Sequence, residues 1–506
     1  MIEKQCDLVV LGGGGSGLTA AVRAAQEGGL RVIVAEKAPK TGGGMIMAST
    51  MRTFRSRWQA ERSLPDVTND YLRKVMDATY WRLDPALVSN AVLATGKFFD
   101  WFCDLAGSDV GKRFRVGRYV FDGEDGPLGP QMGGPGGVTG GGRLFMDTLR
   151  DKCGELGVEI LTGHRALDAE VENGRIRAII AEGPDGPVRI GCRACILAIG
   201  SWINNRAVME DFCPAFLQAR EHMGLSPHMN PNYTGDGFPI AEKVNAMIDR
   251  ENFCIRVMGP MVMSKSGVMS RLPNTPYTLA VNAGGKRYIC EPSHIRFGVF
   301  NSGLVMLEQT RGMSYVLFDT NNLEAALHAQ WNDPQPDAPG IFGLPDWPQT
   351  MEDALRDIES ALTDEPDKVF RADSIEALAA QLGIEPDALR ATIDQYNDGC
   401  AEGFDRLCFK QTEYLVPFSK GPYYAVRAEL GTDGCFGGVK VNGDMQAYRA
   451  DGTLIDGLYV TGDFASGRFL NMTNVKVQVL NDMSWALASG FLAGQNARRA
   501  LLGGSL

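Results

Sequence analysis

The sequence predicts an α/β protein in which helices alternate with the strands of a largely parallel sheet. Residues 6–36 carry this prediction, because an apolar run, a glycine-rich turn, an alanine-rich stretch and a second apolar run follow one another. This order is typical of a strand–turn–helix–strand unit with buried parallel strands. The length of 506 residues exceeds what one hydrophobic core supports, so at least two domains are expected.

The opening unit has recognisable boundaries. Residues 6–12 (CDLVVLG) are expected to form its first strand and residues 30–35 its second. Residues 18–28 between them are rich in alanine and end at a glycine pair, which predicts a helix. The glycine-rich turn at residues 12–17 therefore lies between the end of a strand and the start of a helix.

The segments that follow are expected to be partly helical and partly extended. Residues 66–106 and 143–156 are predicted to be mostly helical, and residues 116–142 to form a long loop rich in Gly and Pro. Loops of that length in a compact protein are usually functional. Residues 158–199 alternate short apolar runs with turn residues, which predicts a β-meander.

The second half of the chain changes character and then returns to the first pattern. Residues 250–435 mix strand-like and helical stretches. The chain then shows a buried strand at residues 457–462 and a last helix from about residue 475 to 502. We interpret this order as a second domain inserted into the first.

Composition and charge exclude several classes of function. Hydrophobic residues make up 44% of the chain and charged residues 22%, as in ordinary globular proteins. The net charge of −11 argues against nucleic acid as the main partner, because phosphate binding needs concentrated Lys and Arg. No apolar stretch reaches membrane-spanning length without charges, so no membrane span and a cytoplasmic location are expected.

The 11 cysteines also favour a reducing cytoplasm, because they lack the spacing of a disulfide framework. Cys192 and Cys195 form a C-x-x-C inside Val188–Ile199, a run that is expected to be one strand. Two packed thiols are therefore the favoured interpretation over a redox pair. No cluster of Cys and His residues predicts a metal site.

The glycine-rich turn carries the clearest chemical signal. Gly12, Gly14 and Gly17 form a G-x-G-x-x-G pattern between a strand and a helix. These glycines permit the tight turn, the approach of a pyrophosphate and close helix–strand packing. Glu36 ends the second strand at the distance expected of a carboxylate that binds the adenosine ribose. The turn therefore predicts a dinucleotide site at a helix N-terminus.

Several further motifs follow in a fixed order. They are Thr41-Gly-Gly-Gly44, Leu197-Ala-Ile-Gly200, Thr234-Gly-Asp-Gly237, Asn282-Ala-Gly-Gly-Lys-Arg-Tyr288 with Glu291, Gly421-Pro-Tyr-Tyr-Ala-Val426, Gly437-Gly438 and Thr461-Gly-Asp463. In this order, over nearly the whole chain, the sequence resembles the fumarate reductase/succinate dehydrogenase flavoprotein superfamily. That superfamily includes the 3-ketosteroid dehydrogenases and flavin ene-reductases.

The resemblance implies a Rossmann-like FAD-binding domain with an inserted α+β capping domain. The FAD-binding domain would comprise residues 1–250 and 436–506, and the capping domain residues 251–435, with the substrate between them. The last helix would direct its N-terminus at the flavin. Residues 41–56 hold no His, the residue to which this family attaches FAD covalently, so non-covalent FAD is expected. The residues expected to bind FAD are Gly12, Gly14, Gly15, Ser16, Gly17, Glu36, Lys37, Gly43, Gly44, Ala198, Gly200, Asp236, Gly462, Asp463 and Val479.

The chain departs from the fumarate reductase pattern where that pattern binds dicarboxylates. The segment Phe253–Met258 lacks the family's His, and the run Asp433–Gly437 lacks its His-Thr. The final Arg-containing motif is replaced by Lys476-Val-Gln-Val-Leu-Asn481. A dicarboxylate substrate is therefore not expected.

The proton donor is expected a few residues after Glu291. His294 and Arg296 are our candidates for the acid and the substrate-orienting group, and the alternative that both are ordinary residues of the capping domain stays open. Tyr119 in the long loop is a further candidate for the catalytic set. Weaker candidates for contact with phosphate, substrate or flavin are Arg143, Arg468 and Lys476.

These features together predict an FAD-dependent oxidoreductase that reduces or forms a C=C bond next to a carbonyl or carboxyl group of a small organic molecule. No second dinucleotide motif or haem motif is present, so electrons are expected to pass to or from a separate redox partner or soluble electron carrier. Two alternatives remain open: a flavoprotein that catalyses a non-redox isomerisation or elimination, and a redox-inactive partner subunit.

Overall fold

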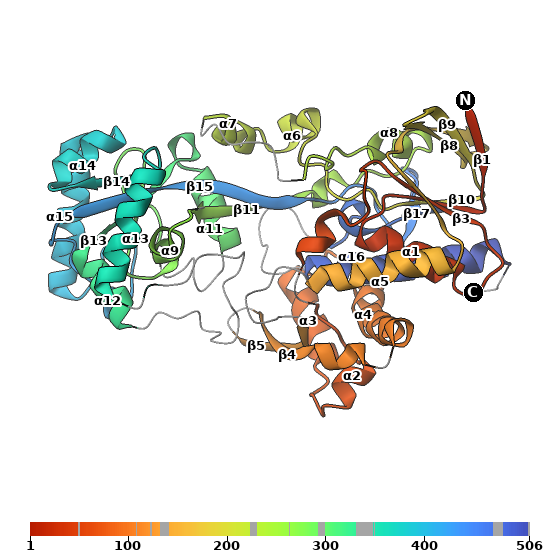
Figure 1. The fold of residues 1–506 in the computed structure, drawn as a ribbon, viewed down its shortest axis with the longest axis horizontal. Helices are drawn as coiled ribbons and strands as arrows, with labels where there is room; N and C mark the ends of the chain where they lie inside the picture. The colour runs from red at the N-terminus through yellow and green to blue at the C-terminus, as the bar shows by residue number, and fades with distance from the viewer. Residues whose placement is uncertain are drawn as a thin grey trace.

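The computed structural model describes residues 1–48, 51–107, 109–121, 124–131, 141–222, 230–262, 264–291, 299–329, 348, 350–468 and 479–503. These residues form a mixed α/β fold with two lobes (Figure 1). The first lobe holds both chain ends and a six-stranded sheet, and the second lobe is built on a five-stranded sheet.

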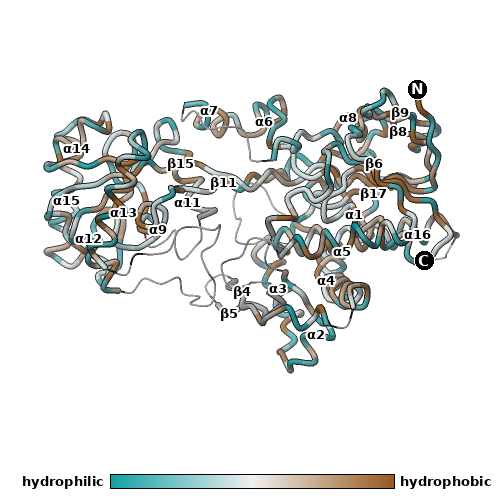
Figure 2. The backbone as a smooth tube through the Cα atoms, viewed as in Figure 1, coloured by the Kyte–Doolittle hydropathy of each residue, from teal (hydrophilic) through white to brown (hydrophobic). Residues whose placement is uncertain are grey.

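The six-stranded sheet has the order β16-β17-β10-β2-β3-β6. All of its neighbouring pairs are parallel except β16 with β17. The strands are β2 (Leu8–Leu11), β3 (Val32–Glu36), β6 (Glu159–Thr162), β10 (Ala194–Leu197), β16 (Gln446–Tyr448) and β17 (Leu454–Val460). β2, β3 and β10 are buried throughout, as parallel strands covered on both faces should be. Figure 2 shows that the strands beside the labels β6 and β17 are strongly apolar.

Two helices from opposite ends of the chain pack together beside this sheet. They are α1 (Gly15–Ala25) and α16 (Asp482–Leu501). Glycines on α16 allow backbone contact, since a Cβ atom added at Gly490 would lie 2.3 Å from the carbonyl oxygen of Ser16. The same holds at Gly494, where an added Cβ atom would lie 2.4 Å from the carbonyl oxygen of Ala20. The first and last helices of the lobe are therefore packed backbone to backbone.

A second sheet of the first lobe has the order β1-β9-β8-β7. Its strands are β1 (Ile2–Gln5), β7 (Arg165–Glu172), β8 (Arg175–Gly183) and β9 (Gly186–Gly191). The predicted meander is thus confirmed for β7, β8 and β9, whereas β6 joins the parallel sheet.

The prediction of one strand over Val188–Ile199 is wrong. The run divides between β9 and β10, which belong to different sheets, because the chain turns at Cys192-Arg193 from one sheet into the other. Cys192 and Cys195 are free, buried thiols. Burial raises the pKa of Cys192 to about 12, so this thiol stays protonated and unreactive at neutral pH.

The second lobe is built on the sheet β11-β15-β13-β12, with β14 also paired to β15. Its strands are β11 (Cys254–Met261), β12 (Leu279–Asn282), β13 (Ser314–Asp319), β14 (Val369–Ala372) and β15 (Tyr423–Phe436). β11 and β15 pair antiparallel from Cys254–Phe436 onward and run from one lobe to the other as a ribbon (Figure 1).

Most of the predicted helices are present with small shifts in their ends. Residues 66–106 hold α3 (Thr68–Ala78) and α4 (Pro85–Ala106), whose first turn is capped by the Asp84 carboxylate. The other α-helices of the described residues are α2 (Arg57–Ala60), α5 (Gly141–Glu155), α6 (Arg206–Phe212), α7 (Pro214–His222), α8 (Gly237–Lys243), α9 (Gly267–Arg271), α11 (Val299–Leu307), α12 (Thr320–His328), α13 (Met351–Asp364), α14 (Ile375–Leu382) and α15 (Pro386–Glu402).

Two predictions of local structure are corrected. The long loop 116–142 contains an antiparallel pair, β4 (Arg115–Phe121) and β5 (Glu124–Gln131), whose many glycines masked the strand pattern. The last helix starts at Asp482 rather than near residue 475, because Asn481 caps it by accepting a hydrogen bond from the Ser484 amide.

Within the described part of the chain, every helix is too short or too polar to cross a lipid bilayer.

The tight turn before α1 yields a first prediction. A Cβ atom added at Gly17 would lie 1.9 Å from the carbonyl oxygen of Gly12, whereas one added at Gly14 would meet nothing within 4 Å. Gly17→Ala should therefore lower the free energy of unfolding by about 3 kcal/mol, and the protein should tolerate Gly14→Ala. Urea unfolding of both variants measures this, and equal destabilisation would contradict it.

Candidate functional site

The glycine-rich turn lies at the carboxyl ends of β2 and β10. Gly12 has φ +108° and rests on Ala198, whose carbonyl oxygen would lie 2.3 Å from a Cβ atom at Gly12. Gly14 faces open space, and the buried Gly15 and Ser16 begin α1 directly after it. The turn thus presents bare backbone at a helix N-terminus, which is the arrangement that accepts a pyrophosphate.

Glu36 lies beside the turn with its carboxylate held in place. One oxygen accepts a hydrogen bond from the Gly13 amide at 2.7 Å, and the other accepts one from the Ala38 amide at 2.7 Å. The side chain is buried at the end of β3. Two backbone donors therefore fix the carboxylate next to Gly14, as a sugar-binding acid requires.

A second glycine segment closes over the turn. The Gly42 amide donates to the Gly13 carbonyl at 2.9 Å, and a Cβ atom on Gly43 would lie 3.3 Å from the Cα atom of Gly14. Tyr233 covers the neighbouring glycines, since its hydroxyl would lie 2.1 Å from a Cβ atom on Gly44. The ring of the same tyrosine would lie 3.4 Å from a Cβ atom on Gly200, which has φ +74°.

Lys37 and Asp236 contact each other. The Lys37 ammonium lies 2.8 Å from the Asp236 carboxylate and also donates to the Thr234 hydroxyl. Arg165 donates to both oxygens of Asp236. Burial alone would raise the pKa of Asp236, but the two cations outweigh it and hold that pKa below its usual range. This network joins the GDG segment to the end of β3.

Gly462 and Asp463 follow β17 and lie beside the same turn. A Cβ atom on Gly462 would lie 2.8 Å from the Ser16 hydroxyl oxygen. The Gly462 amide donates to the Ser489 hydroxyl at 3.0 Å, and its carbonyl accepts from the Trp485 indole at 2.8 Å. Two contacts with α16 thus fix the backbone that carries Asp463.

A cluster of charges surrounds Asp463. Arg468 lies 3.9 Å from Asp463 and also contacts Asp482, the first residue of α16. Arg256 on β11 donates to Asp482 at 2.6 Å. Burial alone would raise the pKa of Asp482, but Arg256 and Arg468 outweigh it and hold that pKa well below its usual range. Burial, followed by the charge of Asp482, raises the pKa of Asp463 to about 7.

Val479 lies at the entrance to α16. It is fully buried, and its carbonyl accepts a hydrogen bond from the Tyr71 hydroxyl at 2.8 Å. Arg52 joins the same region, since its amide donates to the Ser484 hydroxyl at 2.7 Å. The predicted cofactor residues thus gather along the carboxyl edge of the parallel sheet, from Glu36 to the start of α16.

The predicted catalytic residues are less well defined. His294 and Arg296 lie outside the described residues, and of Tyr119 only the backbone, in β4, is described. Among the weaker candidates, Arg143 is exposed at the start of α5 and Lys476 lies outside the described residues.

Glu291, the acid of the hairpin, belongs to a buried cluster of four charges. It pairs with Arg287 at 2.9 Å and with Lys410 at 3.2 Å, and Arg287 pairs with Asp405 at 2.9 Å. Burial alone would raise the pKa of Glu291, but Lys410 and Arg287 outweigh it and lower that pKa. The cluster anchors the segment that leads to His294, and it is a structural support rather than an open site.

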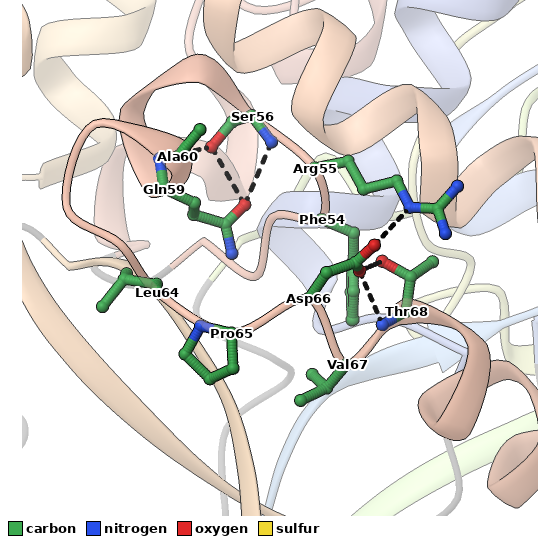
Figure 3. A pocket seen from close by; sticks show the side chains of 10 residues that line it. All are labelled: Phe54, Arg55, Ser56, Gln59, Ala60, Leu64, Pro65, Asp66, Val67 and Thr68. Atoms are coloured by element: carbon green, nitrogen blue, oxygen red, sulfur yellow. Dashed lines mark hydrogen bonds and ion pairs between the residues drawn. The ribbon is translucent and has the colours of Figure 1, made fainter.

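No metal site is found among the described ranges, where no group of three or more His, Cys, Asp and Glu side chains is suitably arranged. A cavity of about 260 Å³ lies between Phe54 and Thr68 (Figure 3). Its polar side chains bond to one another, as in the ion pair of Arg55 with Asp66 at 2.7 Å and the bonds of Ser56 with Gln59. None of its lining residues is a predicted site residue.

Sequence reasoning missed three residues of the site: Arg256, Asp482 and Tyr233. No motif marks Arg256, which lies more than 200 residues before its partner Asp482. Asp482 could have been found as the first residue after a helix cap, had the helix start been placed at Asn481.

The raised pKa of Asp463 yields a second prediction. The pKa of an Asp in an unfolded chain is about 3.9. The free-energy cost of ionising Asp463 in the folded protein therefore grows between about pH 4 and pH 7, and it stays constant above pH 7. Asp463→Asn should therefore stabilise the unliganded protein more at pH 8 than at pH 5, by at most about 3 kcal/mol. Thermal unfolding at both pH values measures this, with the exposed Asp456→Asn as control. A pH-independent effect would contradict it.

Comparison with known proteins agrees with this geometry. The family described as "FAD binding domain" matches residues 7–473. Vinyl phenol reductase of Lactiplantibacillus plantarum is 24% identical over 477 residues, which cover 91% of this chain and 90% of that protein. The 3-oxosteroid 1-dehydrogenase of Mycolicibacterium smegmatis is 24% identical over an alignment that covers 92% of this chain and 93% of that protein.

A solved structure shares the fold over almost the whole chain. It is the open conformation of a flavocytochrome c3 fumarate reductase, with a TM-score of 0.70 and 20% identity over 99% of this chain and 79% of that one. The bare glycine turn and the oriented Glu36 carboxylate fit the pyrophosphate and the ribose of a dinucleotide. The chain therefore belongs to the FAD binding domain family, and FAD is its cofactor.

Proposed function

We propose that FAD lies extended along the carboxyl edge of the parallel sheet. Its ribose would contact Glu36, its pyrophosphate the backbone at Gly14, and its ring the start of α16. The support is the row of predicted residues between Glu36 and Val479. Gly14→Ala, which leaves the unliganded turn unstrained, should then lower the FAD content of the purified protein.

The same proposal divides the chain into a flavin domain, residues 1–250 and 436–506, and a capping domain, residues 251–435. It is supported by β11 and β15, whose paired ends at Cys254 and Phe436 are the points where the chain leaves and re-enters the first lobe. We further propose that FAD is held without a covalent bond, since residues 41–56 contain no His. Release of yellow flavin by acid precipitation tests this.

The chain acts as an FAD-dependent oxidoreductase on a C=C or CH–CH bond next to a carbonyl or carboxyl group. The family match over residues 7–473 supplies the flavin, and the relatives named as a vinyl phenol reductase and a 3-oxosteroid 1-dehydrogenase support the bond type. The names of the two relatives denote a vinyl phenol and a 3-oxosteroid as substrates, whereas the solved structure that shares the fold is named for the dicarboxylate fumarate.

A small neutral organic molecule is the proposed substrate class. The sequence lacks the family's His residues at Phe253–Met258 and Asp433–Gly437. Two arginines of the described site, Arg256 and Arg468, are committed to Asp482. A pair of substrate carboxylates would therefore find these guanidiniums already bound to a carboxylate of the chain.

The chain's own residues must supply a proton and orient the substrate. Bound FAD supplies hydride transfer to or from one carbon of the bond. We assign the proton at the neighbouring carbon to His294 and the polarisation of the activating group to Arg296. Tyr119 is a second candidate donor of a hydrogen bond to the substrate. Electrons would come from, or go to, a separate redox partner or soluble electron carrier.

The function is tested by anaerobic turnover of the purified flavoprotein with a reduced viologen dye. Vinyl phenols, enones and 3-oxosteroids serve as candidate substrates and fumarate as the comparison. The expected product carries two hydrogens more than its substrate, as mass spectrometry would show. A product of unchanged mass would establish the isomerase alternative instead, and a flavin that no substrate or dye reduces or reoxidises would establish a partner subunit.

The proton-donor assignment makes a separate prediction. His294→Ala should lower kcat about a hundredfold or more, because a general acid contributes at least that much. Arg296→Ala should lower kcat/KM strongly, and both variants should keep their flavin spectrum. His222→Ala, on α7, is the matched control. Turnover within about threefold of the unmodified protein after both changes would remove this assignment.

A further inference from the structure

A cluster of charged side chains joins the ribbon of β11 and β15 to the start of α16. Arg256 and Arg468 both contact the carboxylate of Asp482. Both guanidinium carbons also lie over one aromatic ring, that of Phe436, at 5.6 and 5.2 Å from its centroid. The two arginine side chains are only 6% and 2% exposed, so this is no surface ion pair.

Two like charges held side by side away from water are costly. The chain offsets this cost with one shared carboxylate and the face of one ring. A mechanical link between β11 and α16 needs only one of the two arginines. The second arginine adds positive potential at a helix end that is already positive through its dipole.

The cluster lies beside the dinucleotide turn. Arg468 reaches Asp463, and the preceding Gly462 packs against Ser16 of α1. Asp482 starts α16, and Gly490 of the same helix touches the Ser16 backbone. The carboxylates of Asp463 and Asp482 are 22% and 42% exposed, so they face the open side of the cluster, while the arginines lie behind them.

We propose that Arg256, Arg468 and Asp482 together set the reduction potential of the bound flavin. The inference rests on the proposed placement of the flavin ring at the start of α16. A flavin that gains two electrons and one proton gains one negative charge. While Asp463 is protonated, the two arginines and Asp482 leave one net positive charge, which favours the reduced flavin, so the cluster makes the flavin a stronger oxidant.

Arg256 gives this arrangement a second property. It lies on the ribbon that carries the sheet of the second lobe, at a slip in the β11–β15 register between Ile255 and Val257. Irregular pairing of this kind re-aims a side chain. A movement of the ribbon that separates Arg256 from Asp482 removes one positive charge from the flavin end of α16. Such a movement would therefore lower the potential of the flavin.

The test is the midpoint potential of the bound flavin, measured by anaerobic reductive titration against reference dyes. Arg256→Met should lower the equilibrium constant for reduction about tenfold, which is about 30 mV for a two-electron couple. Asp482→Asn should shift the potential upward by a similar amount, and Arg256→Lys should stay near the value of the unmodified protein.

Arg220→Met is the matched control, because Arg220 also lies over an aromatic ring, that of Phe216 at 5.5 Å, but on α7. The midpoint potential of the flavin in Arg220→Met should equal that of the unmodified protein. Shifts of the same sign in Arg256→Met and Asp482→Asn, or changes below about twofold in the equilibrium constant, overturn the proposal. If Arg256→Met does not retain FAD, the test rests on Asp482→Asn. The absence of an upward shift of the potential in that variant then overturns the proposal. Product mass is a separate readout, so failure here leaves the proposed reaction standing.

Discussion

The structure depends on backbone-to-backbone contact around α1. Gly17 lies against the Gly12 carbonyl on one side, and Gly490 and Gly494 of α16 lie against the same helix on the other. Any side chain at these positions would push α1 away from the sheet or from α16. Because α1 cannot shift, its first amides stay aimed at one place, the open space at Gly14. The direction of these amides is thus a consequence of helix packing.

The site draws on segments that are far apart in the chain and meet at one edge of the parallel sheet. Parallel strands place their carboxyl ends together, so Glu36, Gly200 and Asp463 become neighbours of the same turn. The ribbon of β11 and β15 adds Arg256 from outside that sheet. Chemistry at this edge therefore depends on both lobes.

The parts that could be predicted from sequence are those with local signals. The glycine turn, Glu36 and the helices of residues 66–106 follow from spacing and periodicity, and the mixed α/β fold follows from their order. The parts that could not be predicted depend on distant contacts. Nothing near Arg256 announces Asp482, and nothing near Arg287 announces Asp405. Val188–Ile199 is continuous in hydropathy, so its division between two sheets is a tertiary effect. His294 and Arg296 stay predictions.

The pairing of α1 with α16 also governs how the molecule can be assembled on the ribosome. Translation delivers α1 first, and the helix that covers it more than 450 residues later. Throughout that interval the face of α1 around Ser16 and Ala20 lacks its final cover. The glycine-rich turn and the start of α1 therefore cannot reach their final packing before α16 emerges. A nascent chain arrested before that point would present the uncovered apolar face of α1 to chaperones.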